Sequence, residues 1–100
     1  MPLTENQKKH LRGLGHALKP VVTTGEAGLT PAVLAEIRGG LAHHELMKVR
    51  VRGQERGQRD ALVERICRET GAELVQRIGH VALLWLPNPE RRRVSLPGDR

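Results

Sequence analysis

The first apolar pattern along the chain has the spacing of an α-helix. Between residues 4 and 17, leucines recur every three or four positions and form one narrow apolar stripe, made of Leu11, Leu14 and Leu18. Thr4 and Gln7 have the spacing of a capping box, in which two backbone N–H groups at the helix start are satisfied reciprocally. We therefore predict a helix that begins at Thr4 and runs to about Ala17, before Pro20.

A second helix is predicted downstream of a short strand. The β-branched residues 21–24 favour the strand, and residues 25–28, Gly-Glu-Ala-Gly, follow as a turn. Thr30 is a favourable N-cap, and Pro31 suits the first helical position, where a missing N–H costs nothing. The helix should run to about Ala42, and its core-facing residues recur at helical spacing: Val33, Leu34, Ile37 and Leu41.

Residues 46–52 alternate between apolar and basic side chains after Leu46. Met47, Val49 and Val51 should point one way, because side chains alternate across a strand. The residues between them point the other way, which predicts a half-buried strand with a wholly basic exposed face, formed by Lys48, Arg50 and Arg52.

The last part of the chain predicts a helix and a hairpin, after a loop over residues 53–57. A third helix over about residues 58–70 should end at Gly71, which suits a C-terminal cap. Its buried residues are Leu62, Val63, Ile66 and Cys67. Two strands, residues 73–78 and 81–86, are joined by Gly79 and His80, and a two-residue connection with Gly first suits a type II′ turn.

These elements predict an α+β domain with the order αβαβαββ. Crossovers through helices make the early strand connections parallel, whereas the closing hairpin is antiparallel, so the four-stranded sheet is mixed. We expect two layers, with helices on at least one face of the sheet. One domain should occupy residues 1–89, and residues 90–100, with Arg91, Arg92 and Arg93, are expected to form an extended basic tail that orders on a partner.

The composition adds a preference for an anionic partner. Seventeen Lys and Arg against eleven Asp and Glu give a net charge of +6, and binding to a polyanion then releases condensed counterions. Trp85 is the only aromatic residue, so the aromatic platform on which many domains stack splayed bases cannot be assembled. A nucleic acid would therefore be bound mainly through its backbone, its charge and its shape.

The basic residues of the first helix share one sign and largely one face. At 100° per residue, several of them fall together: Lys8, Arg12, His16 and Lys19, with Lys9 at the edge. A solvated helix face is the ordinary interpretation of such a stripe, and the uniform sign favours a role in binding.

The turn at residues 25–28 is a candidate phosphate-binding loop. Glycine permits close approach of a ligand to the backbone, and the following helix N-terminus offers N–H groups and a positive dipole end. KH domains clamp a nucleic-acid backbone with a Gly-x-x-Gly loop of this kind. The alternative is a tight turn between strand and helix that simply needs two glycines.

Metal and catalytic sites are not expected. His43, His44 and Glu45 are adjacent and point in different directions, so they should end the second helix rather than bind a metal. Cys67 is read as a buried small hydrophobe, and Ser95 lies beside no plausible base. We expect no enzymatic activity, no cofactor, no membrane span and no signal peptide, and hence a cytoplasmic protein.

Seven short segments form a collinear pattern from about residue 3 to residue 97. They are QKKHLRGL (7–14), LKPVV (18–22), GEAGLT (25–30), HELMKV (44–49), RETGA (68–72), QRIG (76–79) and SLP (95–97). Together they closely resemble the bacterial YhbY family of stand-alone CRM domains (chloroplast RNA splicing and ribosome maturation).

The resemblance implies a fold similar to the C-terminal domain of translation initiation factor three. It also implies RNA binding and association with precursors of the large ribosomal subunit, so the implied partners are large-subunit ribosomal RNA precursor and pre-ribosomal particles. The residues that would bind RNA by this resemblance are Gly25, Glu26, Ala27, Gly28, Leu29 and Thr30 of the loop, and Lys8, Lys9, Arg12 and Lys19. Lys48 and Arg50 are added from the strand pattern, and Glu26 would repel a phosphate unless its side chain points away.

Two other functions fit the same features. A DNA-binding or nucleoid-type protein would carry the same charge, and a protein-interaction module on the ribosome could use the sheet for docking and the glycine loop only as a turn. For the RNA-binding protein, we expect a monomer.

Overall fold

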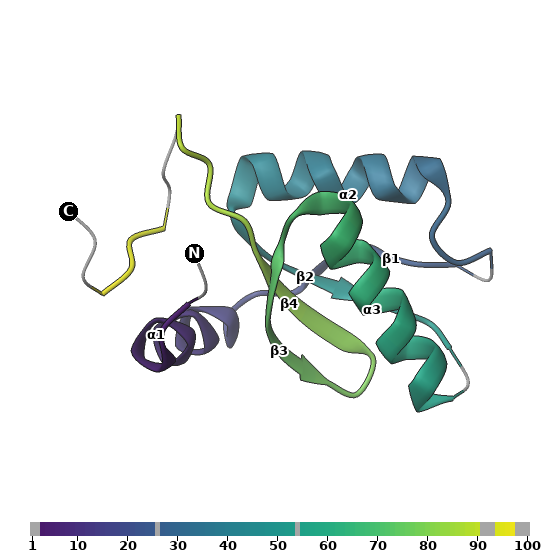
Figure 1. Ribbon diagram of the computed structural model, residues 1–100, viewed down its shortest axis with the longest axis horizontal. Helices are drawn as coiled ribbons and strands as arrows, with labels where there is room; N and C mark the ends of the chain where they lie inside the picture. The colour runs from purple at the N-terminus through teal and green to yellow at the C-terminus, as the bar shows by residue number, and fades with distance from the viewer. Residues whose placement is uncertain (1–2, 26, 54, 91–93, 98–100) are drawn as a thin grey trace.

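The computed structural model describes residues 3–25, 27–53, 55–90 and 94–97. Its elements follow the predicted order αβαβαββ (Figure 1). They are α1 (Glu5–Gly15), β1 (Pro20–Thr23), α2 (Pro31–His44), β2 (Leu46–Arg50), α3 (Arg56–Thr70), β3 (Glu73–Ile78) and β4 (Val81–Trp85). Glu26 and the three arginines at 91–93 lie outside the described residues.

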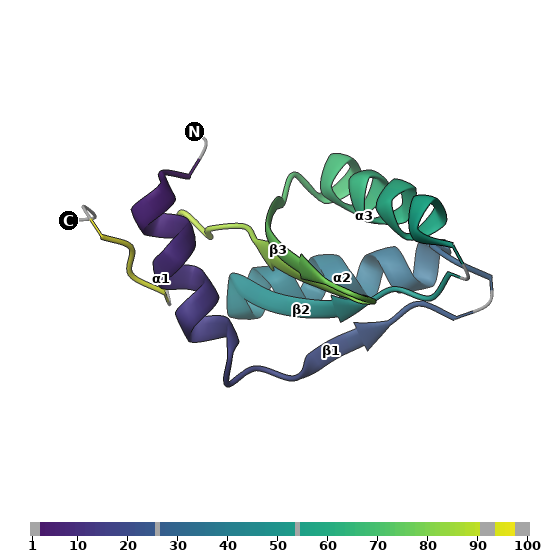
Figure 2. The same cartoon turned by 90° about the horizontal axis from the view of Figure 1, so that it is seen from below.

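The four strands form one mixed sheet in the order β1-β2-β4-β3. β1 and β2 are parallel, whereas β4 pairs antiparallel with both β2 and β3, as the connections predict. Helices α2 and α3 cover one face of this sheet. Helix α1 packs against the other face at one end, and β1 leads away from it (Figure 2).

The helix ends are set by local side-chain and backbone chemistry. Thr4 Oγ1 accepts from Gln7 N at 3.1 Å, and Gln7 Oε1 accepts from Thr4 N at 3.0 Å, so the predicted capping box is confirmed. Thr30 Oγ1 caps α2 by accepting from Val33 N at 3.2 Å. Gly71 ends α3 at φ +80°, in the left-handed conformation that favours glycine.

The main core lies between the sheet and the helices α2 and α3. Met47 and Val49 of β2, and Val51 directly after the strand, are at most 1% exposed and all face this core, so the predicted alternation is confirmed. They pack with residues of α2 and α3: Ile37, Leu41, Val63 and Ile66.

A smaller core lies under α1 on the opposite face. Leu11 is fully buried there against Leu83 and Trp85. The predicted apolar stripe of α1 is otherwise wrong, because Leu14 and Leu18 are 42% and 37% exposed. The physical reason is that the helix ends at Gly15, so Leu18 lies in the following turn, and Leu14 lies away from the face that meets the sheet.

A buried carboxylate, which the sequence did not suggest, fixes the chain after β4. Glu45 ends α2 with φ +64°, an uncommon conformation for a residue with a side chain, and is 0% exposed. Its Oε2 accepts from Asn88 N at 2.6 Å, and its Oε1 accepts from Val94 N at 2.9 Å. The carboxylate therefore ties the end of α2 to the segment that follows the sheet.

The described residues 94–97 also lie against α1. His10 Nε2 lies 3.0 Å from Ser95 O, and Gln7 Nε2 donates to Pro97 O at 3.2 Å. Val94 and Leu96 pack on the smaller core. This differs from the expectation that the whole tail orders only on a partner, because these contacts lie within the chain itself.

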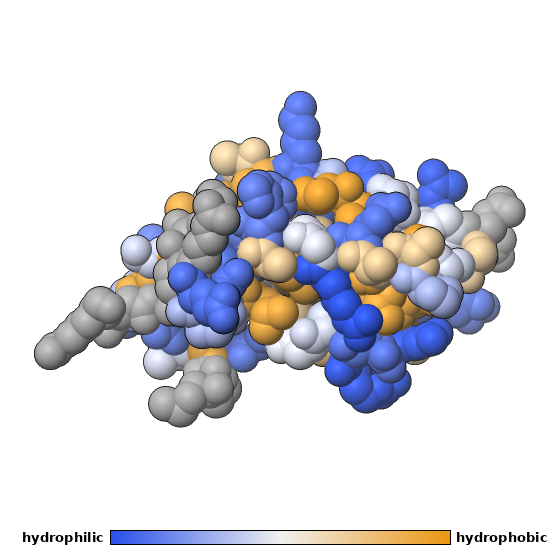
Figure 3. All heavy atoms as spheres, turned by 90° about the horizontal axis from the view of Figure 1, so that it is seen from above, coloured by the Kyte–Doolittle hydropathy of each residue, from blue (hydrophilic) through white to orange (hydrophobic). Residues whose placement is uncertain are grey.

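The surface over α2 is mixed in character. Apolar patches are interrupted by hydrophilic side chains on this side of the molecule (Figure 3). Among the described residues, no helix has the length and apolar character needed to cross a membrane.

Replacing Glu45 by Ala should lower the free energy of unfolding by about 2 kcal/mol, because the half-buried N–H groups of Asn88 and Val94 lose this acceptor. Urea denaturation of Glu45→Ala beside the exposed control Glu36→Ala checks this, and the control should stay within about 0.5 kcal/mol of the parent chain. Equal stability of the two variants would contradict the role of the carboxylate.

Candidate functional site

The open part of the sheet face beside α1 is the candidate site. Two rows of paired residues cross it from β1 to β3, and each row carries one basic side chain from β2. One row is Thr23, Arg50, Val81 and Ile78, and the other is Pro20, Lys48, Leu83 and Gln76. Neither row contains an acidic residue.

A β-bulge at Val75 places the outer end of each row. The residues on either side of it, Leu74 and Gln76, pair with Leu84 and Leu83, so Val75 is an extra residue in β3. Leu84 faces the main core and Leu83 faces α1. The bulge therefore turns Gln76 onto the open face, where strict alternation from Leu74 would have pointed it toward α3.

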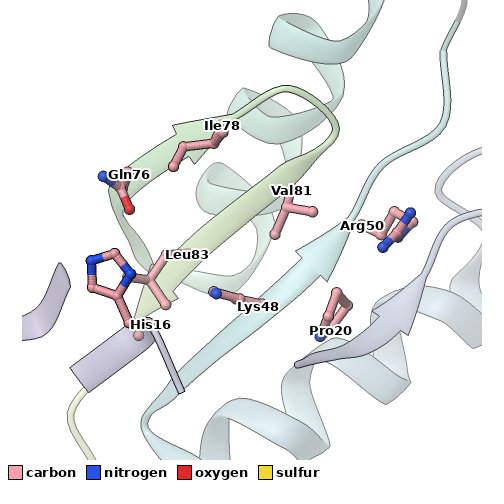
Figure 4. A pocket seen from close by; sticks show the side chains of 9 residues that line it. His16, Pro20, Lys48, Arg50, Gln76, Ile78, Val81 and Leu83 are labelled. Atoms are coloured by element: carbon pink, nitrogen blue, oxygen red, sulfur yellow. The ribbon is translucent and has the colours of Figure 1, made fainter. Parts of the chain in front are cut away.

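These rows border a cavity of about 250 Å³. The side chains of Ile78, Val81 and Leu83 give it an apolar floor, and His16 enters from the end of α1 (Figure 4). Lys48 and Arg50 lie along one side and Gln76 along the other (Figure 4). The site thus combines an apolar surface with positive charge and one amide.

Helix α1 reaches this cavity because Gly15 permits a close approach. A Cβ atom at Gly15 would lie 2.7 Å from Leu83 Cδ2, so any larger residue there would require the Leu83 side chain to move. His16 follows directly, and Arg12 and Lys8 precede it at intervals of four residues on the same helix face. The basic row predicted on α1 therefore leads away from the cavity.

The glycine loop lies at the other end of the basic strand. Thr24 is fully buried, its N–H donates to Arg50 O at 2.9 Å, and its Oγ1 accepts from Arg52 N at 2.9 Å. These two hydrogen bonds hold the start of the loop beside the end of β2. The cavity, the basic strand and the loop therefore follow one another along the open side of the sheet. We call this surface the basic path: it consists of the cavity, the basic residues Lys48, Arg50 and Arg52, and the glycine loop.

The loop uses several of its own N–H groups. Gly28 N donates to Gly25 O at 3.0 Å, and Thr30 N donates to Gly28 O at 3.2 Å. Gly28 has φ +75°, a conformation that favours glycine, whereas Gly25 does not lie in the left-handed region. The first turn of α2 loses further donors, because Pro31 has no N–H and Val33 N serves the cap. Ala32 N is the first-turn donor that remains for an anion.

The other predicted loop and helix residues lie as follows. The side chain of Leu29 is buried in the main core, so it is not available to a ligand. Ala27, Lys9 and Lys19 are exposed, and Glu26 lies outside the described residues. Lys48 is half-buried, and its Nζ donates to Leu18 O at 3.1 Å, which holds the ammonium group next to the end of α1.

Charges on the helix-covered side are arranged differently. Arg77, which neighbours Gln76 in β3, points toward α3 and forms an ion pair with Asp60. Its charge is therefore already paired on that side, whereas Arg50 extends from the open face toward solvent.

The remaining reactive side chains lie away from the basic path. His43 and His44 end α2, as predicted, with ring centroids 4.6 Å apart. Cys67 is half-buried, and burial, with the nearby carboxylates of Glu64 and Glu73, raises the pKa of its thiol. A raised pKa disfavours the thiolate, the reactive form of cysteine.

Sequence reasoning missed the apolar half of the site. Val81 and Leu83 read as ordinary strand residues, Pro20 as the end of the first helix, and Gln76 is placed by a bulge that leaves no clear signal in the sequence. The hydrogen bonds that hold the start of the loop beside the end of β2 had one signal in the sequence, the polar residue Thr24 at the end of the β-branched run.

The comparisons with known proteins agree over nearly the whole chain. Residues 3–85 match the model of the CRS1 / YhbY (CRM) domain family. A Haemophilus influenzae protein named RNA-binding protein is 47% identical over 95 residues, covering 95% of each chain. A Pseudomonas aeruginosa protein named as a probable RNA-binding protein is 46% identical over 90 residues, covering 90% of this chain and 86% of its own.

A solved structure shares the fold. The solution structure of the hypothetical protein SAV1595 from Staphylococcus aureus, described as a candidate RNA-binding protein, superposes with a TM-score of 0.82. The two sequences are 31% identical, and the match covers 96% of this chain and all of that one.

The two glycines of α1 should respond differently to replacement by alanine. Gly13→Ala should stabilise the protein by about 0.5–1 kcal/mol, because Gly13 has no neighbour within 4 Å of the added Cβ and alanine favours the helix. Gly15→Ala should gain less, since Leu83 must move. Urea denaturation of both variants checks this, and equal gains would show that α1 does not press on the sheet.

Proposed function

Since the chain belongs to the CRS1 / YhbY (CRM) domain family, we propose that it is an RNA-binding protein, and that it acts in the cytoplasm on precursors of the large ribosomal subunit. The names of its relatives support the first part of this proposal. The observation that carries it is the basic path, on which cationic side chains lie beside an open sheet face and end at a glycine loop.

The proposed mechanism is mainly electrostatic. Lys48, Arg50 and Arg52 neutralise backbone phosphates along the sheet, and Lys8 and Arg12 extend the contact along α1. The loop contributes close approach at Gly25 and the N–H of Ala32, fewer donors than a loop with all of its amides free would offer. Selectivity among RNAs then comes from shape, because few side chains can read base edges.

Removing two charges from the basic path should weaken binding in a salt-dependent way. Arg50→Ala/Arg52→Ala should lower affinity for a labelled structured RNA and reduce the slope of log K against log salt concentration by about 2, since each lost phosphate contact contributes about 0.9 for a duplex. Fluorescence anisotropy over a salt series measures both quantities.

The matched control is Arg65→Ala/Arg68→Ala, which removes the same charge from exposed positions of α3. Equal losses in the two variants would mean that net charge alone determines binding. A competition with duplex DNA at the same salt concentration belongs in this experiment, because preference for DNA would overturn the RNA proposal in favour of a nucleoid-type protein.

In cells, the protein should crosslink to large-subunit ribosomal RNA precursor, and Gly25→Asp should abolish that enrichment. Gly25 has open space around it and needs no left-handed backbone, so the carboxylate can enter the loop without strain and repel phosphate. Gly25→Asn adds a side chain of the same size without charge and should retain most of the crosslinks. Sequencing of crosslinked RNA measures the effect.

Three results of the cell experiment would contradict parts of the proposal. Crosslinks that persist in Gly25→Asp would leave the loop as a turn only. Enrichment of other RNAs would overturn the ribosomal role. Association with ribosome precursors that survives nuclease treatment, without crosslinks, would favour a protein-interaction module.

A further inference from the structure

We propose that the cavity on the open sheet face binds the base of one unpaired RNA nucleotide. This inference rests on the proposed function and adds a subsite to it: the basic side chains hold the backbone, whereas the cavity takes a base. It concerns residues that charge and glycine patterns do not identify, chiefly Gln76, Ile78 and Val81.

The size of the cavity selects a small ligand. Pockets that enclose drug-sized molecules or cofactors measure roughly 300–1,000 Å³, and this cavity of about 250 Å³ lies below that range. A single planar base is a ligand of suitable size.

The lining matches the two parts of a nucleotide. Val81 and Leu83 occupy successive positions on the open side of β4, but Leu83 is only 2% exposed, so the accessible apolar surface comes mainly from Val81 and from Ile78 beside it, which is 67% exposed. An apolar floor can contact the face of any base. His16 adds the one kind of aromatic ring available here, because Trp85 is only 3% exposed, and histidine is among the side chains on which RNA bases stack.

The polar groups lie on opposite sides of that floor. Lys48 and Gln76 both pair with Leu83, from β2 and β3, so their backbones are roughly 10 Å apart at the usual strand spacing. Phosphate fits the side of Lys48 and Arg50, where the charge lies. The amide of Gln76 offers both a donor and an acceptor to a base edge, and its side chain makes no hydrogen bond among the residues that the structure describes.

The occupant must be unpaired, because a base within a duplex does not expose its face. The basic path alone would bind paired and unpaired RNA through the same phosphates. A preference for unpaired nucleotides therefore separates the cavity from the rest of the surface.

The test compares two labelled RNAs with equal numbers of phosphates, a hairpin with an unpaired loop and a blunt duplex. The parent chain should bind the hairpin more tightly, by about 10-fold, which is of the order expected for one stacked base. Gln76→Leu/Ile78→Thr, which changes no charge, should lose this preference while its affinity for the duplex stays unchanged.

Leu74→Thr is the matched control. It shortens another exposed apolar side chain of β3, but Leu74 lies on the α3 side of the sheet, next to Cys67. This variant should keep the preference. In a complementary measurement on the parent chain, adding the hairpin should shift the methyl resonances of Ile78 and Val81 in NMR spectra more than adding the duplex does, which tests the subsite even where the double variant fails to fold.

The outcomes separate this inference from the proposed function. Binding of hairpin and duplex with equal affinity, with no selective methyl shift, would overturn the base subsite and leave RNA binding intact. Equal loss of both RNAs in Gln76→Leu/Ile78→Thr would also overturn it, because the residues would then serve the backbone. Failure of the parent chain to bind either RNA would overturn the proposed function and the subsite with it.

Discussion

Strand β2 imposes the constraint on which the rest of the molecule depends. It is paired on both sides, with β1 and β4, so its side chains can point only to one face of the sheet or the other. Met47 and Val49, with Val51 directly after the strand, must then be covered, and α2 and α3 cover them. The same alternation turns Lys48 and Arg50 to the second face, where burial without partners would be costly. A cationic face left open to solvent follows from the way in which the core is built.

Helix α1 can cover only the end of that second face where the strands supply apolar residues. Leu46, Val75 and Trp85 accept Leu11 there, and Gly15 lets the helix approach Leu83. Beyond this point Lys48 and Arg50 interrupt the apolar surface, and the helix ends. The two open rows are thus the part of the sheet that α1 cannot cover without burying charge. This explains why the cavity has an apolar floor and a basic side.

Features with a local cause could be predicted from the sequence. The caps at Thr4 and Thr30 depend on residues three positions apart, and the alternation in β2 depends on neighbours, so each left a readable pattern. The basic part of the candidate site was found for the same reason. Contacts between distant residues left no such pattern: Glu45 read as part of a polar helix end, although its carboxylate holds Asn88 and Val94.

The bulges on the edge strands were equally hidden. An extra residue at Val21 and another at Val75 shift the register by one, which changes the face on which the following side chains lie. In β3 the consequence is that Gln76 lies on the open face, across β4 from the basic strand β2, although alternation read from Leu74 would place it under α3. Periodicity assumes an unbroken register, so a site made by a bulge escapes it.

The scarcity of aromatic residues limits how many bases the open face of the sheet can contact. With Trp85 buried, no broad stacking platform exists among the described residues, so a long run of bases could not be held on this sheet. The apolar residues of the two open rows, Ile78, Val81 and Leu83, form only a small surface, and the cationic residues beside them continue toward the glycine loop. Such a surface favours backbone contact over sequence reading. Recognition of a folded RNA by its shape, with one base in the proposed subsite, needs no larger apolar face.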